Sequence, residues 1–249
     1  KDKYEREEKV DVLSLSENLG YAKGNNEGLR FIKKYNPQYV CVVNNDVRFS
    51  LDVIKRLERI YPLINNVALL SPVQFLLDNK PAIFNDLRHI PTFGEDFKSV
   101  LGFGKCVRHS YMPDCEKIKL QKVEIVPGAF LFIDYLLFES MGFFYEGTFL
   151  FCEERFTAKK IKDAGLCSYI LLDDYYVHAH SVTINAEKTR RDQMKLLYEG
   201  KILYTNCYRS FPLFKIFLLK IAYMLSYFVE VLKNIVRYCS GLFACEHLR

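Results

Sequence analysis

The sequence predicts an α/β domain with a mixed, mainly parallel sheet flanked by helices, followed by an apolar helical extension. In the first half, short apolar runs alternate with helix-like segments, an order that favours parallel strands joined by helices. Hydrophobic residues make up 50% of the 249 residues and charged residues 26%, which supports a sizeable core and excludes a disordered chain. A strongly apolar stretch follows, so we expect a domain at 1–205 and a separate extension at 206–249.

The first elements follow from local patterns. Apolar runs predict strands at Val10–Leu15, Tyr39–Val43 and Val67–Ser71. Helices are predicted between them at Asn25–Tyr35 and Ser50–Tyr61. The serine that begins the second helix is a suitable N-cap, and apolar residues recur on one face of that helix.

The second half is less regular. Residues 72–122 contain scattered glycines and predict loops or hairpins. After them we expect strands at Val123–Ile133 and Cys167–Leu172, and helices at Asp134–Met141, Glu153–Ala164 and Glu187–Leu203.

Charge and cysteine content exclude several classes of protein. The net charge of +5 and the pI near 8.6 suit anionic substrates or an anionic membrane face, and are too small to indicate nucleic acid as a partner. The eight cysteines form no C-x-x-C pair, so we expect reduced, buried thiols and no zinc ribbon. The charged start Lys1–Lys9 lacks the apolar core of a signal peptide.

Polar residues follow the strand at Tyr39–Val43. A carboxylate at the end of such a strand faces the ligand crevice of an α/β sheet, so Asp46 could hold a divalent cation, with the Asn44 amide as a weaker partner. A simple turn would also explain both residues. His178 follows another strand and could complete the site, and its nitrogen would favour Mn²⁺ over Mg²⁺.

Two further segments carry candidate chemistry. The glycine-rich stretch Asn18–Gly28 opens a helix, where backbone can approach an anion closely, although a glycine-rich connection would look the same. Glu153 and Glu154 follow an aromatic run and begin a helix. They are either partners of the helix dipole or a general base beside an aromatic pocket.

Taken in order, these segments resemble the family 2 glycosyltransferases of the GT-A fold, with the rhamnosyltransferase-like enzymes as the most similar subgroup. The resemblance covers about residues 10–205 and rests on five motifs. These are Asn18–Gly28, Asn44–Asp46, Pro127-Gly128-Ala129, Gly142–Glu154 and His178–Ser181.

The resemblance implies an inverting transfer from a nucleotide-diphosphate sugar to a saccharide or lipid-linked saccharide hydroxyl. It implies Mn²⁺ or Mg²⁺ at Asp46 and His178, with Glu154 as general base. It implies donor or acceptor contacts by six residues: Asn18, Gly20, Asn26, Asn44, Gly128 and Ala129, to which we add Glu153. The implied role is synthesis of a cell-surface polysaccharide, O-antigen or capsule, at the cytoplasmic face of the cell membrane.

Departures from the family pattern support other functions. Glu154 stands where the family usually has Asp, and Lys1–Lys9 contains neither of the two turns, T-x-N and D-N-x-S, that normally touch the nucleotide. We therefore expect an N-terminally incomplete domain, and the alternative function is a catalytically degenerate GT-A module that scaffolds a membrane assembly. A nucleotidyltransferase ranks lower, because no basic phosphate loop is visible.

The apolar stretch Phe211–Lys233 leaves its own alternatives open. On a helical wheel most of its polar residues share one stripe, and Lys220 stands off that stripe. Internal charges disfavour a membrane span. The segment either lies in an anionic membrane interface, which we favour slightly, or packs onto the domain or a second copy as a homo-oligomer.

Overall fold

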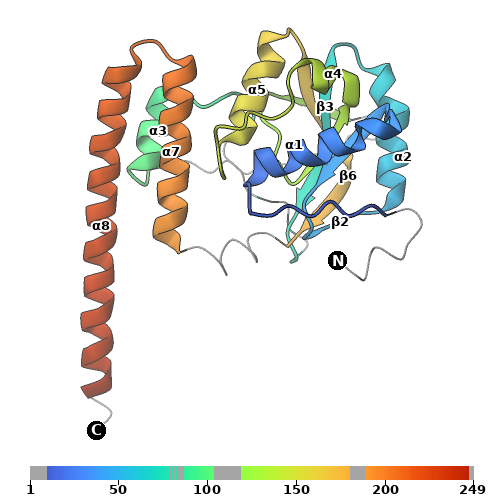
Figure 1. Ribbon diagram of the computed structural model, residues 1–249. Coiled ribbons are helices and arrows are strands. Elements are labelled where there is room, and N and C mark those ends of the chain that lie inside the picture. The colour runs from blue at the N-terminus through green and yellow to red at the C-terminus, as the bar shows by residue number, and fades with distance from the viewer. Residues whose placement is uncertain are drawn as a thin grey trace. The chain divides into compact units, whose positions relative to one another are not determined.

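The computed structural model describes residues 10–78, 80, 82, 87–103, 119–179 and 189–246, without the side chains of 190 and 234–246 (Figure 1). The chain forms two compact units. The first comprises Lys1–Ala82, Leu87–Ile90 and Ser110–His180, and the second comprises Ile83–Asp86, Pro91–His109 and Ser181–Arg249.

The first unit is built on a six-stranded sheet with the order β1-β5-β3-β6-β2, and β4 pairs with β6. The α/β class and the mixed sheet are confirmed. The expectation of mainly parallel pairing is wrong: β3 and β6 pair in parallel, and the other described pairs are antiparallel. The reason is that β5 lies between β1 and β3 and runs opposite to both. The strands are β1 (Tyr39–Val43), β2 (Val47–Arg48), β3 (Val67–Phe75), β4 (Leu120–Val123), β5 (Phe130–Asp134) and β6 (Cys167–His178).

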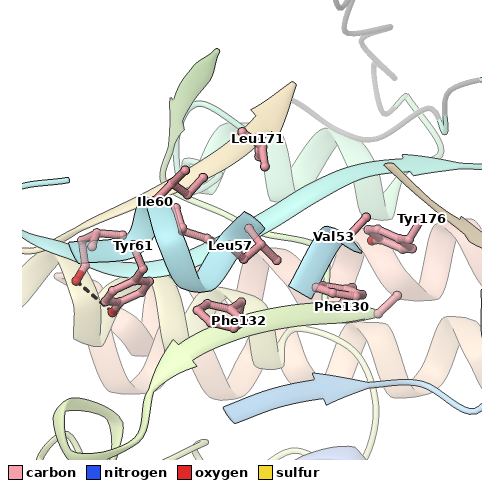
Figure 2. Packing of buried hydrophobic residues seen from close by; sticks show 11 residues of the cluster. Val53, Leu57, Ile60, Tyr61, Phe130, Phe132, Leu171 and Tyr176 are labelled. Atoms are coloured by element: carbon pink, nitrogen blue, oxygen red, sulfur yellow. Dashed lines mark hydrogen bonds between the residues drawn. The ribbon is translucent and has the colours of Figure 1, made fainter. Parts of the chain in front are cut away.

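Helices cover both faces of this sheet. On α2, the Ser50 hydroxyl accepts a hydrogen bond from the Asp52 N–H, which confirms the predicted N-cap. Figure 2 shows Val53 and Leu57 of this helix packed against Phe130 of β5, and the whole cluster is buried. The helices of the unit are α1 (Tyr21–Ile32), η1 (Lys33–Tyr35), α2 (Leu51–Ile60), η2 (Tyr61–Leu63), α4 (Tyr135–Ser140) and α5 (Glu153–Asp163).

Two further expectations from the sequence are wrong. Val10–Leu15 forms no strand, because none of the described strands pairs with it, and its apolar side chains are exposed. Residues 72–122 contain a helix, α3 (Phe93–Val100), which begins with a capping box between Thr92 and Glu95. Of the eight cysteines, four have described thiols, and none of these four forms a disulfide: Cys41, Cys152, Cys167 and Cys207.

The second unit is helical. It contains α3, α7 (Arg190–Tyr208) and α8 (Pro212–Glu246), which contact one another, and Figure 1 shows α7 and α8 side by side as a hairpin. The expected apolar helix is therefore confirmed as α8. α7 shares this unit with α8, although most of its residues precede the boundary expected at 205.

Candidate active site

A short hairpin brings Asp46 and His178 together. After β1 the chain turns, and the Val47 N–H donates to the Asn44 carbonyl at 3.2 Å. β2 then pairs with the end of β6, which sets Val47 opposite His178. The Ala179 N–H donates to the Asp46 carbonyl at 3.0 Å, and Asp46 Oδ1 lies 3.0 Å from His178 Nε2. The two predicted metal ligands are therefore neighbours at one edge of the sheet.

The His178 ring is held from its other side by a buried amide. Gln74 Nε2 lies 3.2 Å from His178 Nδ1, and the Tyr176 hydroxyl donates to Gln74 Oε1 at 2.8 Å. Gln74 is 3% exposed and Tyr176 is fully buried. With Gln74 Nε2 donating to Nδ1, a neutral His178 ring carries its proton on Nε2, where it faces the Asp46 carboxylate. Sequence patterns did not identify Gln74 or Tyr176, because their contacts depend on the register between β3 and β6.

The chemistry of this pair fits a divalent cation. A carboxylate oxygen and an imidazole nitrogen are ordinary ligands of Mn²⁺, and both side chains are only partly exposed, at 21% for Asp46 and 11% for His178. Within the described residues, no group of three or more His, Cys, Asp or Glu side chains could hold a metal. Such a two-ligand site suits a cation that keeps its other positions for water and for substrate phosphates.

The segment Gly128-Ala129 connects this hairpin to the candidate base. The Asn44 N–H donates to the Ala129 carbonyl at 3.0 Å, and the Tyr21 hydroxyl donates to the Gly128 carbonyl at 2.5 Å. A Cβ atom at Gly128 would lie 3.1 Å from the Tyr21 hydroxyl and 3.6 Å from Glu154 Oε1. Glycine at this position therefore lets Tyr21 and Glu154 approach the backbone.

Glu153 and Glu154 begin α5 in an apolar environment. Burial raises the pKa of both carboxyls above the usual value, and the charge of Glu154 raises the pKa of Glu153 further. The residues before the helix, Phe151 and Cys152, adopt left-handed φ values of +69° and +67°, which orient the first turn. Both predicted carboxylates are thus held by a strained helix start.

A small cavity adjoins these carboxylates. It has a volume of about 10 Å³, room for a single water, and its lining includes Tyr21, Gly128 and Glu154. Glu153 Oε2 and Ser168 Oγ are buried there without a hydrogen-bond partner among the described residues. Unpaired buried oxygens beside a cavity of this size make it a suitable place for a bound water.

The glycine-rich stretch organises the backbone around the site. Asn18 Oδ1 accepts from the Gly20 N–H at 2.9 Å, and Gly20 has a φ of +80° with the Phe149 carbonyl against its Cα. Asn26 is 1% exposed, and its amide bonds the Phe144 carbonyl and N–H at 3.0 Å each. Direct ligand contact was expected of Asn26, but burial gives it a structural role instead. The motif that begins at His178 continues to His180 and Ser181, which lie outside the described residues.

Comparisons with known proteins find similarity only among solved structures. No protein-family model and no curated protein sequence matches the chain. A crystal structure of GalNAc-T7 with UDP, GalNAc and Mn²⁺ is similar at a TM-score of 0.48 and 13% sequence identity. The match covers 67% of this chain and 32% of that chain, so this chain spans about a third of the length of the structure it matches.

Proposed function

We propose that this chain is a metal-dependent glycosyltransferase that moves a sugar from a nucleotide-diphosphate donor to an acceptor hydroxyl. The observation that supports this most strongly is the 3.0 Å separation between Asp46 Oδ1 and His178 Nε2. The two residues are distant in the sequence, and the motif resemblance implied both as ligands of one cation. Their meeting at one sheet edge is the arrangement that this chemistry needs.

Asp46 and His178 would hold Mn²⁺ or Mg²⁺. When bound, such a cation neutralises the negative charge that develops on the departing diphosphate. Gln74 orients the imidazole and Asn44 fixes the turn, so the two ligands are positioned before the substrate arrives.

Glu154 is the proposed general base. The acceptor hydroxyl must lose its proton as its oxygen attacks the anomeric carbon, and a carboxylate whose pKa is raised by burial is a better proton acceptor than an exposed one. The oxygen–carbon bond forms as the bond to the diphosphate breaks, from the opposite face, which inverts the anomeric centre.

The proposed substrates follow from the motif resemblance. The donor is a nucleotide-diphosphate sugar, and the acceptor is a saccharide or a lipid-linked saccharide of a cell-surface polysaccharide, an O-antigen or a capsule. The proposed location of the reaction is the cytoplasmic side of the cell membrane. The mildly basic balance of the chain suits the anionic donor.

The proposal is tested by incubating the full chain with Mn²⁺ and a panel of nucleotide sugars, and measuring donor hydrolysis and transfer. Glu154→Gln is expected to lower kcat by roughly 10²–10⁴-fold while leaving Mn²⁺ affinity unchanged, because it removes only the base. The control is Glu58→Gln, an exposed glutamate of α2, which should change neither quantity. Equal rates in the wild type and the Glu154→Gln variant would contradict the assignment of the base.

A second candidate function is a degenerate GT-A module that scaffolds a membrane assembly. The small cavity favours it, since the cavity of about 10 Å³ that Glu154 lines is too small to enclose an acceptor sugar. Binding of Mn²⁺ and nucleotide without turnover of any donor would support the scaffold, whereas measurable transfer would exclude it.

A further inference from the structure

The inner side of α8, which faces the rest of the second unit, carries both apolar and polar residues. Leu219 and Ala222 are fully buried there, Glu230 is 6% exposed, and Lys215 and Ser226 are half-buried. Tyr223 stacks on Tyr198 of α7 at 4.2 Å on this inner side. The outer side carries the large exposed apolar residues Leu213, Phe214, Phe217, Ile221, Met224, Leu225, Phe228, Val229 and Leu232.

These outer residues form one continuous face. At about 100° per residue, they fall within an arc of roughly 160° on the helical wheel. Lys220 and Tyr227 lie at one border of that arc. Long lysines and tyrosines at such a border can keep their polar ends in water while their apolar parts are buried, as they do at membrane surfaces.

The charges on this side favour an anionic surface over a second copy of the chain. Of the described side chains of α8, the exposed charged ones are Lys220 and Lys233, and the single acid, Glu230, is buried. A two-fold contact through the same face would place lysines of both copies beside an apolar interface, with no exposed acid among the described side chains of α8 to pair them. Anionic lipid headgroups supply the opposite charge.

The packing of α7 decides between lying on a bilayer and crossing it. By length and composition, Pro212–Lys233 is sufficient for a span, with a mean hydropathy of 1.5. However, α7 packs along α8 and carries exposed charges, among them Lys195 and Glu199, which are 66% and 53% exposed. A span would draw these charges into the hydrocarbon, at a high cost.

We propose that α8 is an interfacial helix, which lies along an anionic lipid bilayer with its outer apolar face among the acyl chains. The exposed outer residues supply the apolar face, the exposed lysines supply the attraction, and α7 keeps the helix from crossing. This proposal does not depend on the sugar-transfer activity and holds equally for an inactive chain.

The absence of tryptophan from the chain allows a direct test. In the full chain, Leu225→Trp places a single fluorophore near the middle of the apolar face, and Leu63→Trp places one at an exposed site of the first unit. With phosphatidylglycerol-containing vesicles, we expect a blue shift for Leu225→Trp and none for Leu63→Trp. Lipids brominated near the headgroup should quench the Leu225→Trp emission more than lipids brominated near the chain ends. The opposite order would indicate a span and overturn the proposal.

Vesicle sedimentation of charged variants gives an independent test. Phe217→Glu with Phe228→Glu should lower partitioning at least tenfold, while the matched pair Leu63→Glu with Leu136→Glu, exposed in the first unit, leaves it unchanged. Lys220→Gln should lower binding to anionic vesicles about fivefold. Added salt should also weaken binding of the wild type, because it screens the attraction between the lysines and the lipid headgroups. No vesicle binding by the wild type would overturn the proposal. If the wild type binds no vesicles but forms a dimer, and Phe217→Glu with Phe228→Glu dissociates that dimer, then a second copy of the chain covers the face.

Discussion

At the scale of single residues, the buried amide of Gln74 contacts the histidine of the candidate metal site. It lies between the Tyr176 hydroxyl and His178 Nδ1. A metal on His178 Nε2 requires the proton on Nδ1, and a half-turn of the amide would present an oxygen to accept it, with the Tyr176 hydroxyl serving either end. Gln74 can therefore hydrogen-bond to either tautomer of the His178 ring, whereas an apolar side chain can bond to neither.

Gln74→Leu should consequently weaken Mn²⁺ binding by about 10–100-fold, the usual effect of losing a partner of a ligating histidine. Mn²⁺ titration followed by electron paramagnetic resonance measures this without any assay of activity. Gln121→Leu, at a partly exposed position of β4, is the control and should bind like the wild type. An unchanged affinity in Gln74→Leu would show that His178 does not need this partner.

The buried carboxyl of Glu153 predicts a pH-dependent stability. Its pKa is raised in the folded state, so the native chain keeps a proton that the unfolded chain releases above about pH 4.3. Stability is therefore lost as pH rises through that value toward the native pKa. Glu153→Gln should melt at a higher temperature than the wild type near pH 7 and at the same temperature near pH 4. A difference that does not vary with pH would contradict a raised pKa for this buried carboxyl.

At the scale of the elements, the start of α1 depends on Gly20. Its φ is +80°, and a Cβ atom there would lie 2.3 Å from the Phe149 carbonyl oxygen. Gly20→Ala should therefore cost at least about 2 kcal/mol of unfolding free energy, from backbone strain and the clash. Gly24→Ala is the matched control, because nothing lies within 4 Å of its Cβ position, and it should gain about 0.5–1 kcal/mol. Urea denaturation measures both, and equal effects would contradict this account of the turn.

A buried ion cluster holds α3 to the helices of the second unit. Asp96, 1% exposed, lies 3.7 Å from Lys201 Nζ and forms an ion pair with Arg209. Asp96→Ala leaves two buried cations without this partner, so we expect a loss of about 3–5 kcal/mol in urea denaturation. Asp163→Ala breaks an exposed pair with Lys159 and should cost less than about 1 kcal/mol. Similar costs for the two would show that the cluster is dispensable.

Local signals predicted the elements that depend on local physics. The strand Tyr39–Val43, the Ser50 cap and the helix that begins at Glu153 follow from hydrophobic pattern and capping alone. The helix after Thr92 carried an equally local signal, the Thr92–Glu95 capping box, which the pattern of residues 72–122 obscured. The strand expected at Val10–Leu15 failed because a strand also needs a neighbouring edge, which local pattern does not encode.

The candidate site could be predicted only in part for the same reason. Motif order identified Asp46, His178 and Glu154, but the pairing of β2 with β6 that joins the first two is nonlocal. Asn26 and Gly20 lie in the same motif as expected ligand contacts, yet their neighbours give them structural roles. Whether a residue of a motif is buried or exposed depends on the elements that the rest of the fold packs against it.

At the scale of the whole molecule, each of the two units carries one of the two proposed functions. The first unit carries the hairpin of Asp46 and His178 and the carboxylates of α5. The second carries α8 and its outward apolar face. A transferase that adds sugars to a lipid-linked acceptor gains from such a helix, because the enzyme and its acceptor are then both held at the membrane surface.

The most direct test of the central claim is a Mn²⁺ titration of the full chain by electron paramagnetic resonance, with and without a nucleoside diphosphate. The account predicts saturable binding that the diphosphate tightens, and an affinity at least tenfold lower in Asp46→Asn and in His178→Gln. Asp52→Asn, an exposed carboxylate of α2 whose side chain is 84% accessible, should match the wild type. Equal Mn²⁺ affinities in the wild type, Asp46→Asn and His178→Gln would show that the two side chains meet for a reason other than binding a cation.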